Sequence, residues 1–306
     1  MSEKPIAVYA AATANLVIAA AKFAAAGITG SSAMLAEGIH SVVDTGNQLL
    51  LLVGHKRSQK PPDEQHPLGY GKELYFWGLM VAVLLFGIGG GMSVYEGLHS
   101  LRAPARRGDA LLSYVVIGIA AVAEGASWLI AVRSVQRSRG GGSFLSKLNR
   151  SKDPSKFVVV GEDSAALVGL LAALLGIFLS ERWHSRYPDA IASVFIGLVL
   201  GAVAVYLVIQ TKHLLLGESA DPLLVERIRS AALSAPDVTD VSRPLTVHFG
   251  PEALLVNLHV SFISGLDGDG LPAAMEQLEK SVRVAVPQVK WLFIDVGAIT
   301  GGDAKK

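Results

Sequence analysis

Long apolar segments constrain the fold of this chain more than any other feature of its sequence. Six segments before residue 210 stay apolar over about 20 residues, the length that an α-helix needs to cross a lipid bilayer. They run from Ile6 to Ile28, Met34 to Val53, Tyr75 to Val94, Leu111 to Val132, Phe157 to Ser180 and Ala190 to Val208. Of the 306 residues, 51% are hydrophobic and 17% are charged, which is too apolar for one soluble domain. The sequence predicts an integral membrane protein with a six-helix transmembrane bundle.

Basic residues in the linkers predict the orientation of this bundle. The linker after the second segment carries Lys56, Arg57, Lys60 and Lys72, and the linker after the fourth is the most basic of all. Because basic loops stay on the cytoplasmic side, these linkers and both termini are expected there. We expect a bacterial inner membrane. The tract Gly140-Gly141-Gly142 in the most basic linker predicts a flexible connection, because no strand precedes it.

The pattern of hydrophobic residues changes after His213 and predicts a second, cytoplasmic domain. We expect a transporter domain over residues 1–213 and an α/β domain over residues 214–306. Its predicted elements, in the order αββαβ, are Asp221 to Leu233, Val238 to Phe249, Ala253 to Ile263, Leu271 to Val286 and Val289 to Val296. They form three strands backed by two helices. In the middle strand Leu254, Val256, Leu258, Val260 and Phe262 are expected to face Met275, Leu278 and Val282 and to leave a polar face free.

The second apolar segment contains a pair of polar residues that needs a physical reason. His40 and Asp44 lie four residues apart, so on a helix both side chains rise from one face, with Glu37 beside them. An ionisable side chain at membrane depth costs at least about 2.5 kcal/mol unless it is paired or lines a wet cavity. An imidazole and a carboxylate at this spacing can bind one divalent cation. A buried His–Asp hydrogen bond that only fixes helix packing explains the pair equally well.

The fifth segment contains two adjacent acids, Glu162 and Asp163, inside its cytoplasmic end. Neighbouring helix positions differ by about 100° in direction, so the two acids need not face the same cavity. Asp163 is favoured because its depth is similar to that of Asp44 on an antiparallel helix. A structural acid pair satisfied by nearby Ser or Asn side chains is the alternative.

Other polar residues lie inside apolar segments. These are Asn15, Lys22, Glu96 and Glu124. They fix the helix register by pairing with one another, or they shape a water-filled proton path; the sequence leaves both interpretations open.

The order of these features resembles the cation diffusion facilitator family of metal/proton antiporters. The resemblance rests on the six segments, the His40-x-x-x-Asp44 spacing, the acid in the fifth segment, the run His66-Pro67-Leu68-Gly69-Tyr70-Gly71-Lys72-Glu73 and the small α/β domain. It implies a homodimer with a ferredoxin-like cytoplasmic domain.

In that family two residues of the second span and two of the fifth hold Zn²⁺. By resemblance His40, Asp44 and Asp163 take three of these roles, but the fourth position is Val159, which cannot bind a metal. Three alternatives stay open: Glu162 supplies the missing oxygen, a water molecule supplies it, or the coordination shifts toward harder ions such as Mn²⁺ or Fe²⁺.

The resemblance also implies two secondary metal sites. Asp63 and His66 match a loop site of some relatives, but Tyr70 stands at its second histidine position. His259 and Asp295 are candidates for a site between the cytoplasmic domains of a dimer. A solvated loop and an exposed polar sheet face explain the same residues without any metal.

We therefore expect a secondary transporter that exports a divalent transition metal from the cytoplasm in exchange for protons, with Zn²⁺ first and Fe²⁺, Mn²⁺ and Co²⁺ as alternatives. It is not an enzyme, holds no tightly bound cofactor and has membrane lipid, the metal, protons and a second copy as partners. The net charge of +1 gives no case for nucleic acid, and the absence of Cys excludes thiolate ligands.

Two alternatives remain. One is an intramembrane metal-dependent hydrolase with Glu162 as general base, which is disfavoured because no HExxH pairing is present. The other is a regulatory membrane protein, if Glu162 and Asp163 point away from His40.

Overall fold

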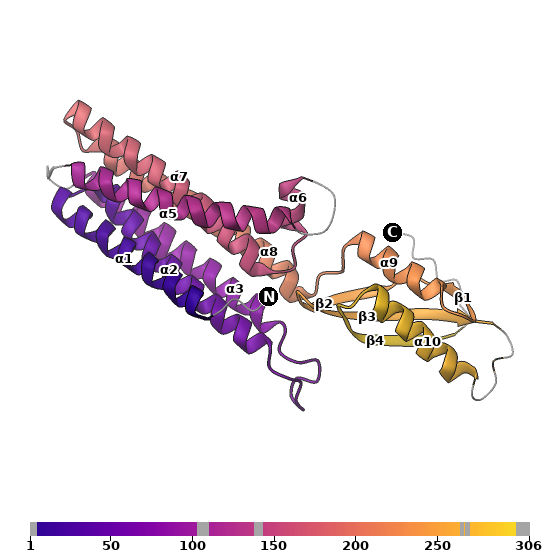
Figure 1. The fold of residues 1–306 in the computed structure, drawn as a ribbon. Helices are drawn as coiled ribbons and strands as arrows, with labels where there is room; N and C mark the ends of the chain where they lie inside the picture. Colours follow the sequence, from indigo (N-terminus) through magenta and orange to yellow (C-terminus); the bar gives the residue numbers. More distant parts are fainter. Residues whose placement is uncertain (1–4, 103–109, 138–142, 264–265, 267–269, 298–306) are drawn as a thin grey trace. The chain divides into compact units, whose positions relative to one another are not determined.

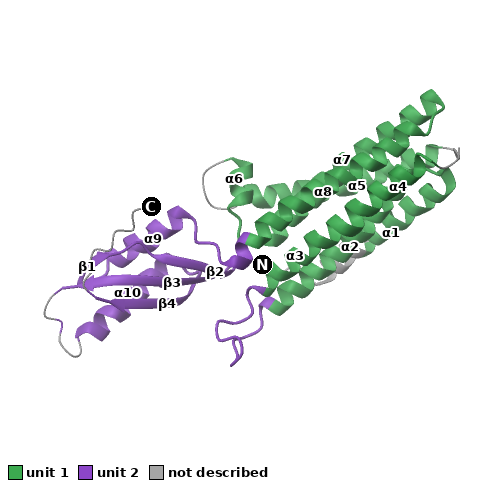
Figure 2. Cartoon of the chain, turned by 180° about the vertical axis from the view of Figure 1, so that it is seen from behind, with its two compact units in different colours: residues 1–57, 73–212 green, residues 58–72, 213–306 purple. Residues whose placement is uncertain are grey.

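A computed structural model of the chain describes residues 5–102, 110–137, 143–263, 266 and 270–297. The chain divides into two compact units (Figure 2). The first, here called the membrane unit, contains residues 1–57 and 73–212, and the second, the C-terminal unit, contains residues 58–72 and 213–306. The linker that joins the second and third predicted segments therefore packs with the C-terminal unit.

Long helices build the membrane unit (Figure 1). They are α1 (Pro5–Thr29), α2 (Ser32–Ser58), the continuous run of α3 (Glu73–Leu84), the π-helical η1 (Leu85–Gly90) and α4 (Gly91–Ser100), then α5 (Leu111–Gln136), the short α6 (Phe144–Asn149), α7 (Pro154–Trp183) and α8 (Tyr187–Leu216). Each predicted apolar segment lies inside one of the long helices or the α3–α4 run.

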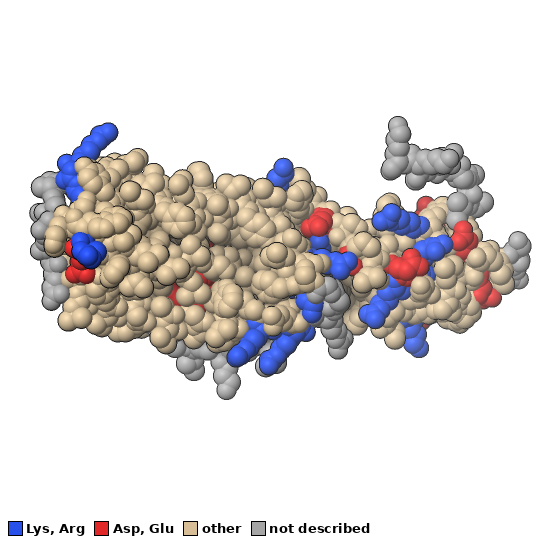
Figure 3. All heavy atoms as spheres, turned by 90° about the horizontal axis from the view of Figure 1, so that it is seen from above, with Lys and Arg blue, Asp and Glu red and all other residues tan. Residues whose placement is uncertain are grey.

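Four stretches of the described chain are long and apolar enough to cross a membrane. They are Glu73–Ser100, Leu111–Gln136, Pro154–Trp183 and Tyr187–Leu216. On the face shown in Figure 3, Lys, Arg, Asp and Glu side chains gather near the ends of the membrane unit, and its sides are almost free of them. A helical surface without charge suits lipid contact, because hydrocarbon solvates charged groups poorly.

The helix α6 lies in the most basic linker, just after the glycine tract for which the sequence predicts a flexible connection. The Ser143 side chain caps its N-terminus by accepting a hydrogen bond from the Ser146 N–H, at 3.3 Å. The glycine tract 140–142 lies outside the described residues, so the flexible connection predicted for it stays a prediction. The Ser cap was the sequence signal for this helix.

The η1–α4 run and the helix α8 approach each other closely where glycines face each other. A Cβ atom placed on Gly197 would lie 2.7 Å from the Gly90 carbonyl oxygen and 2.6 Å from a methyl group of Val94. Only a residue without a side chain allows this backbone contact. Glycines that weaken an isolated helix thus strengthen the packing of two helices in lipid.

The C-terminal unit is an α/β domain. Its elements are α9 (Pro222–Leu233), β1 (Val238–Val241), β2 (Leu245–Gly250), β3 (Ala253–Phe262), α10 (Gly270–Ala285) and β4 (Val289–Val296). The long strand β3 pairs with β1 and β2 in antiparallel fashion and with β4 in parallel. The parallel pair needs a crossover, which α10 supplies.

The strand predicted over Val238 to Phe249 is two strands, so the prediction of three strands was wrong. The chain leaves the sheet between Val241 and Leu245, where β1 ends and β2 begins. Pro244 lies in this gap and has no N–H to donate to a strand neighbour. Both pieces pair with the same β3, β1 near its end at Phe262 and β2 near its start at Ala253.

Alternate residues of β3 form the core of the C-terminal unit. Leu254, Val256, Leu258 and Val260 are buried, together with Leu278 and Val282 of α10 and Val225, Ile228 and Ala232 of α9. This agrees with the predicted period of two. Phe262 is only partly buried at its edge, and Met275 is half-buried, because Ala274 takes the inward position of that helical turn.

The uncovered side of the sheet, here called the open face, is not purely polar as predicted. It carries His259 and Asp295, which are register neighbours, but also Leu255 beside Trp291. Phe293 on the same face is 53% exposed. Apolar residues in such a position indicate a surface that another molecule covers.

The close contact of α4 and α8 predicts opposite effects for two glycine substitutions. Gly197→Ala should lower the free energy of unfolding by about 1–3 kcal/mol, because its methyl group meets backbone and Val94. Gly118→Ala should be neutral or stabilising, since Gly118 of α5 has no neighbouring atom within 4 Å of the added carbon. Thermal unfolding of the detergent-purified chain, followed by size-exclusion chromatography, measures both. Equal stability of the two variants would contradict the packing argument.

Candidate metal site

The helix α2 buries a row of polar side chains inside the membrane unit. His40, Asp44 and Asn47 are 1%, 2% and 0% exposed. They lie three or four residues apart, so they share one face of the helix. A buried polar row on an otherwise apolar helix indicates a polar cavity between helices.

Two hydrogen bonds between neighbouring helices fix the register of α5 against α7. The Ser127 hydroxyl donates to Asp163 Oδ2 at 2.8 Å, and the Trp128 indole N–H donates to Ser164 Oγ at 2.9 Å. The Ser164 hydroxyl in turn donates to the Val160 carbonyl. This register brings Glu124, one turn before Ser127, to the level of Asp163.

Three carboxyl groups from three helices meet in this cavity. One oxygen each of Asp44 in α2, Glu124 in α5 and Asp163 in α7 lie within 4.8 Å of one another, and all three residues are buried. We call these residues the acidic triad. Two oxygens on opposite sides of a bound ion lie about 4.4 Å apart when each metal–oxygen distance is 2.2 Å. The triad therefore has the dimensions of a divalent cation site.

The Glu162 carboxyl points to a different partner. Asn47 Nδ2 donates a hydrogen bond to Glu162 Oε1 at 2.6 Å, and Glu162 lies near enough to Asp44 for the two carboxyl groups to interact. Glu162 therefore contacts the triad residue Asp44 but is not a member of the triad. The sequence predicted that the adjacent acids Glu162 and Asp163 need not face the same cavity, and their different hydrogen-bond partners agree with this.

His40 lies outside the acidic triad. Both of its ring nitrogens are buried and have no hydrogen-bond partner among the described residues. The alternative of a structural His40–Asp44 hydrogen bond is therefore absent from the structure. An imidazole buried without a partner is unusual and indicates a missing ligand.

A second buried charge pair joins α1 to α2. The Lys22 ammonium donates to Glu37 Oε2 at 2.9 Å and to Ser41 Oγ at 2.8 Å, and both charged side chains are 0% exposed. The other carboxylate oxygen of Glu37 lies against Gly169 of α7, where a Cβ atom would come within 2.2 Å of it. The sequence left two roles open for the polar residues inside apolar segments, pairing or a proton path. Lys22 is paired, but its partner is Glu37 and not another residue of that set.

The sequence pointed to Asp44 and Asp163, which the fold brings together, but not to Glu124 as their neighbour. An acid inside an apolar segment was the signal for Glu124. Spacing along one helix cannot show which acids of other helices it faces, because that depends on packing.

The loop candidates Asp63 and His66 lie in the linker of the C-terminal unit. Asp63 Oδ1 accepts from the backbone N–H of His66 at 2.7 Å, and Asp63 Oδ2 accepts from the Tyr70 hydroxyl at 2.6 Å. These two donors hold the pKa of the exposed Asp63 carboxyl below its ordinary value. The carboxylate thus closes the turn of this loop.

His259 and Asp295 form a second candidate pair, on the open face. His259 Nδ1 lies 3.1 Å from Asp295 Oδ2 across the β3–β4 register. Within the described part of the chain, neither this pair nor the loop pair gathers a third His or acid at metal-binding distance.

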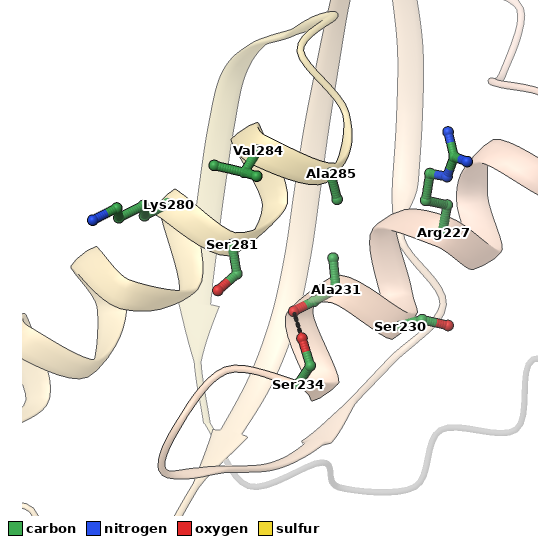
Figure 4. Close-up of a pocket in the computed structure, with 8 residues that line it drawn as sticks. All are labelled: Arg227, Ser230, Ala231, Ser234, Lys280, Ser281, Val284 and Ala285. Carbon is green, nitrogen blue, oxygen red and sulfur yellow. Dashed lines mark hydrogen bonds between the residues drawn. The ribbon is translucent and has the colours of Figure 1, made fainter.

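Two hollows lie elsewhere. In the membrane unit a cavity of 760 Å³ lies at the end opposite α6, among the ends of α1, α4, α5 and α7. Asp189 lines this cavity and accepts hydrogen bonds from Ser31 and Ser32. In the C-terminal unit a shallow hollow lies between α9 and α10 (Figure 4). Its lining contains Lys280 and Arg227 but no carboxylate or imidazole, so it is not a metal site.

Comparison with known proteins identifies the family of this chain. Residues 8–216 match the model of the cation efflux transmembrane domain. The chain belongs to the cation efflux family. This confirms the resemblance to cation diffusion facilitators that the sequence indicated. The cation efflux family consists of transporters and not of enzymes, so the hydrolase alternative was wrong.

Relatives of this cation efflux chain carry different metals in their names. Proton-coupled zinc antiporter SLC30A9, mitochondrial, of Xenopus laevis is 33% identical over 254 residues, which cover 82% of this chain and 44% of that protein. Metal tolerance protein C4 of Arabidopsis thaliana is 34% identical over 209 residues, 68% of this chain and 46% of that protein. Manganese efflux system protein MneP of Bacillus subtilis is 25% identical over 236 residues, 75% of this chain and 74% of that protein. The chain thus spans about half the length of the first two.

The Lys22–Glu37 pair predicts a strong dependence of stability on charge pairing. Lys22→Met should destabilise the membrane unit by about 3 kcal/mol, because it leaves a buried carboxylate unpaired. The double variant Lys22→Met/Glu37→Gln should recover most of that loss. Thermal unfolding in detergent compares them, with Lys56→Met, an exposed lysine at the end of α2, as the matched control. A double variant no more stable than Lys22→Met would refute the role of the pair.

Proposed function

We propose that this chain exports a divalent transition metal from the cytoplasm in exchange for protons. The observation that carries the proposal is the acidic triad, three buried carboxyl groups from α2, α5 and α7. Buried carboxyl groups need protons or cations to neutralise them. The nearby ammonium of Lys22 already binds Glu37, so a divalent cation is the natural counter-charge.

Competition between metal and protons supplies the exchange. A carboxylate must be ionised and an imidazole neutral to bind a metal ion, so metal and protons compete for the same lone pairs. Asp44 and Asp163 are the central ligands of our proposal. His40 and Glu162 complete the set, His40 because its ring nitrogens have no partner and Glu162 because it contacts Asp44.

Zn²⁺ is the first candidate substrate, with Mn²⁺, Fe²⁺ and Co²⁺ as alternatives. The names of the relatives support zinc and manganese. An imidazole beside carboxylates suits zinc, whereas oxygen ligands suit manganese.

We further propose six membrane spans, with both termini on the cytoplasmic side of a bacterial inner membrane. The α1 and α2 helices are 25 and 27 residues long, which is enough to span a bilayer. Residues 1–213 are then the transporter domain, and residues 214–306 are a ferredoxin-like cytoplasmic domain for dimerisation and regulation. Alternating access follows when the helices that carry the site rock against their neighbours.

The open face of the sheet is the dimer contact in this proposal. A two-fold axis would place Phe293 and Leu255 against their copies and exclude water from them. His259 and Asp295 would then reach residues of the second copy, which would supply the pair with further metal ligands. Asp63 and His66 remain a weaker secondary pair, because the turn of the loop uses the carboxylate.

Removal of one triad carboxylate tests the transport proposal. Asp44→Ala and Asp163→Ala should each abolish metal uptake into sealed vesicles while the protein stays inserted, because each change removes an anionic ligand and little apolar packing. Uptake of Zn²⁺, Mn²⁺, Fe²⁺ and Co²⁺ against a pH gradient is the measurement. Near-normal uptake of all four metals by Asp163→Ala would refute the proposal that Asp44 and Asp163 bind one metal ion.

A charge on the open face tests the dimer. Phe293→Glu should weaken dimerisation of the full chain at least about tenfold, because two carboxylates would face each other across the axis. Val284→Glu is the matched control, since Val284 is 76% exposed on α10, away from the open face. Light scattering of the detergent-purified chain over a concentration series gives the dimer dissociation constant. Equal constants for the two variants would exclude the open face.

A further inference from the structure

The acidic triad contains one residue that neither of the two proposed site helices supplies. Glu124 comes from α5, whereas His40 and Asp44 come from α2, and Glu162 and Asp163 from α7. We propose that Glu124 is a metal ligand and that its carboxylate extends the selectivity of the site from Zn²⁺ toward Mn²⁺. This inference rests on the proposed function.

Hydrogen bonding separates Glu124 from the other candidate ligand, Glu162. The carboxyl of Glu162 is engaged by the Asn47 amide at 2.6 Å. Glu124 accepts no hydrogen bond from any other described residue, although it is only 6% exposed. A buried carboxyl group without a donor is poised to bind a cation.

Lys22 makes no direct ion pair with Glu124. Among the described residues its ion pair is with Glu37, and its second hydrogen bond goes to Ser41. The triad therefore gathers three acids without a partner cation from the protein. Asp44 Oδ1 is likewise buried and unpartnered, which is independent evidence that a ligand is missing at this point.

The helix packing holds Glu124 in place. Ser127 and Trp128, on the next turn of α5, both bind α7, so the backbone of Glu124 is held at the level of Asp163. The geometry thus supplies three oxygen ligands on three different helices.

The chemistry of the ligands sets the metal. Mn²⁺ binds more weakly than the other first-row divalent ions to a given site, and it prefers oxygen ligands. It therefore depends most on the number of carboxylates. Zn²⁺ accepts imidazole readily, so the His40 ligand of the proposed set retains Zn²⁺ better than Mn²⁺ when one carboxylate is lost.

The experiment compares metal binding and transport by the full chain and its Glu124→Gln variant. Calorimetric titration with Mn²⁺ and, separately, Zn²⁺ should show Mn²⁺ affinity at least about tenfold weaker in the variant, with Zn²⁺ affinity changed less than about threefold. The matched control is Glu96→Gln, a half-buried acid of α4 outside the triad, which should leave both affinities unchanged.

The outcomes distinguish this inference from the proposed function. Two results would overturn the role of Glu124. One is an unchanged Mn²⁺ affinity in Glu124→Gln. The other is an equal loss of Mn²⁺ and Zn²⁺ affinity in a variant that elutes like the parent. If the variant loses Mn²⁺ binding as expected but parent vesicles transport neither metal, the ligand stands and the transport proposal fails.

A second measurement needs no variant. Hydrophobic carbodiimides modify buried carboxyl groups, and mass spectrometry locates the product. Mn²⁺ should protect Glu124 of the parent chain from modification. Equal modification of Glu124 with and without Mn²⁺ would overturn the inference, even if Glu124→Gln failed to fold.

Discussion

The cost of burying charge among lipid-facing helices governs the structure of the membrane unit. Among the described residues, the buried Lys22 and the buried acids of α2, α5 and α7 either pair with one another or gather in one polar cavity. Lys22 and Glu37 neutralise each other, while Asp44, Glu124 and Asp163 gather without a protein cation. The first arrangement stabilises the fold. The second leaves negative charge that protons or a metal ion must neutralise. The same physical constraint therefore produces both a structural pair and a functional site.

The two arrangements depend on each other through α2. Glu37, His40, Asp44 and Asn47 lie on consecutive turns of this helix. Glu37 anchors it to α1, and Asn47 anchors it to α7 through Glu162. The triad residue Asp44 lies between these anchors. Its position is thus set by contacts above and below it, as expected of a site whose ligands must stay within a fraction of an ångström of the bound geometry.

The C-terminal unit follows a different physical rule. Its sheet buries one face under α9 and α10 by alternating residues, and the other face keeps apolar residues in contact with solvent. A monomer gains nothing from exposing Phe293, so this residue suits a surface that a second copy covers. The linker of residues 58–72 belongs to this unit, where Lys72 lies 4.8 Å from the Phe249 ring. This linker follows α2 directly along the chain.

The sequence by itself determined the elements. Every apolar segment became part of a long helix, and the period of two marked the buried residues of β3. The isolated acids marked the polar cavity. These properties depend on neighbours along the chain, because helix and strand periodicities are local. Only the tertiary structure decided that Glu124 joins Asp44 and Asp163, that His40 and Glu162 lie outside the triad, and that Lys22 pairs with Glu37. It also divided one predicted strand at Pro244. These contacts join residues far apart in sequence, and they depend on the rotation and register of packed helices, which no spacing within one helix encodes.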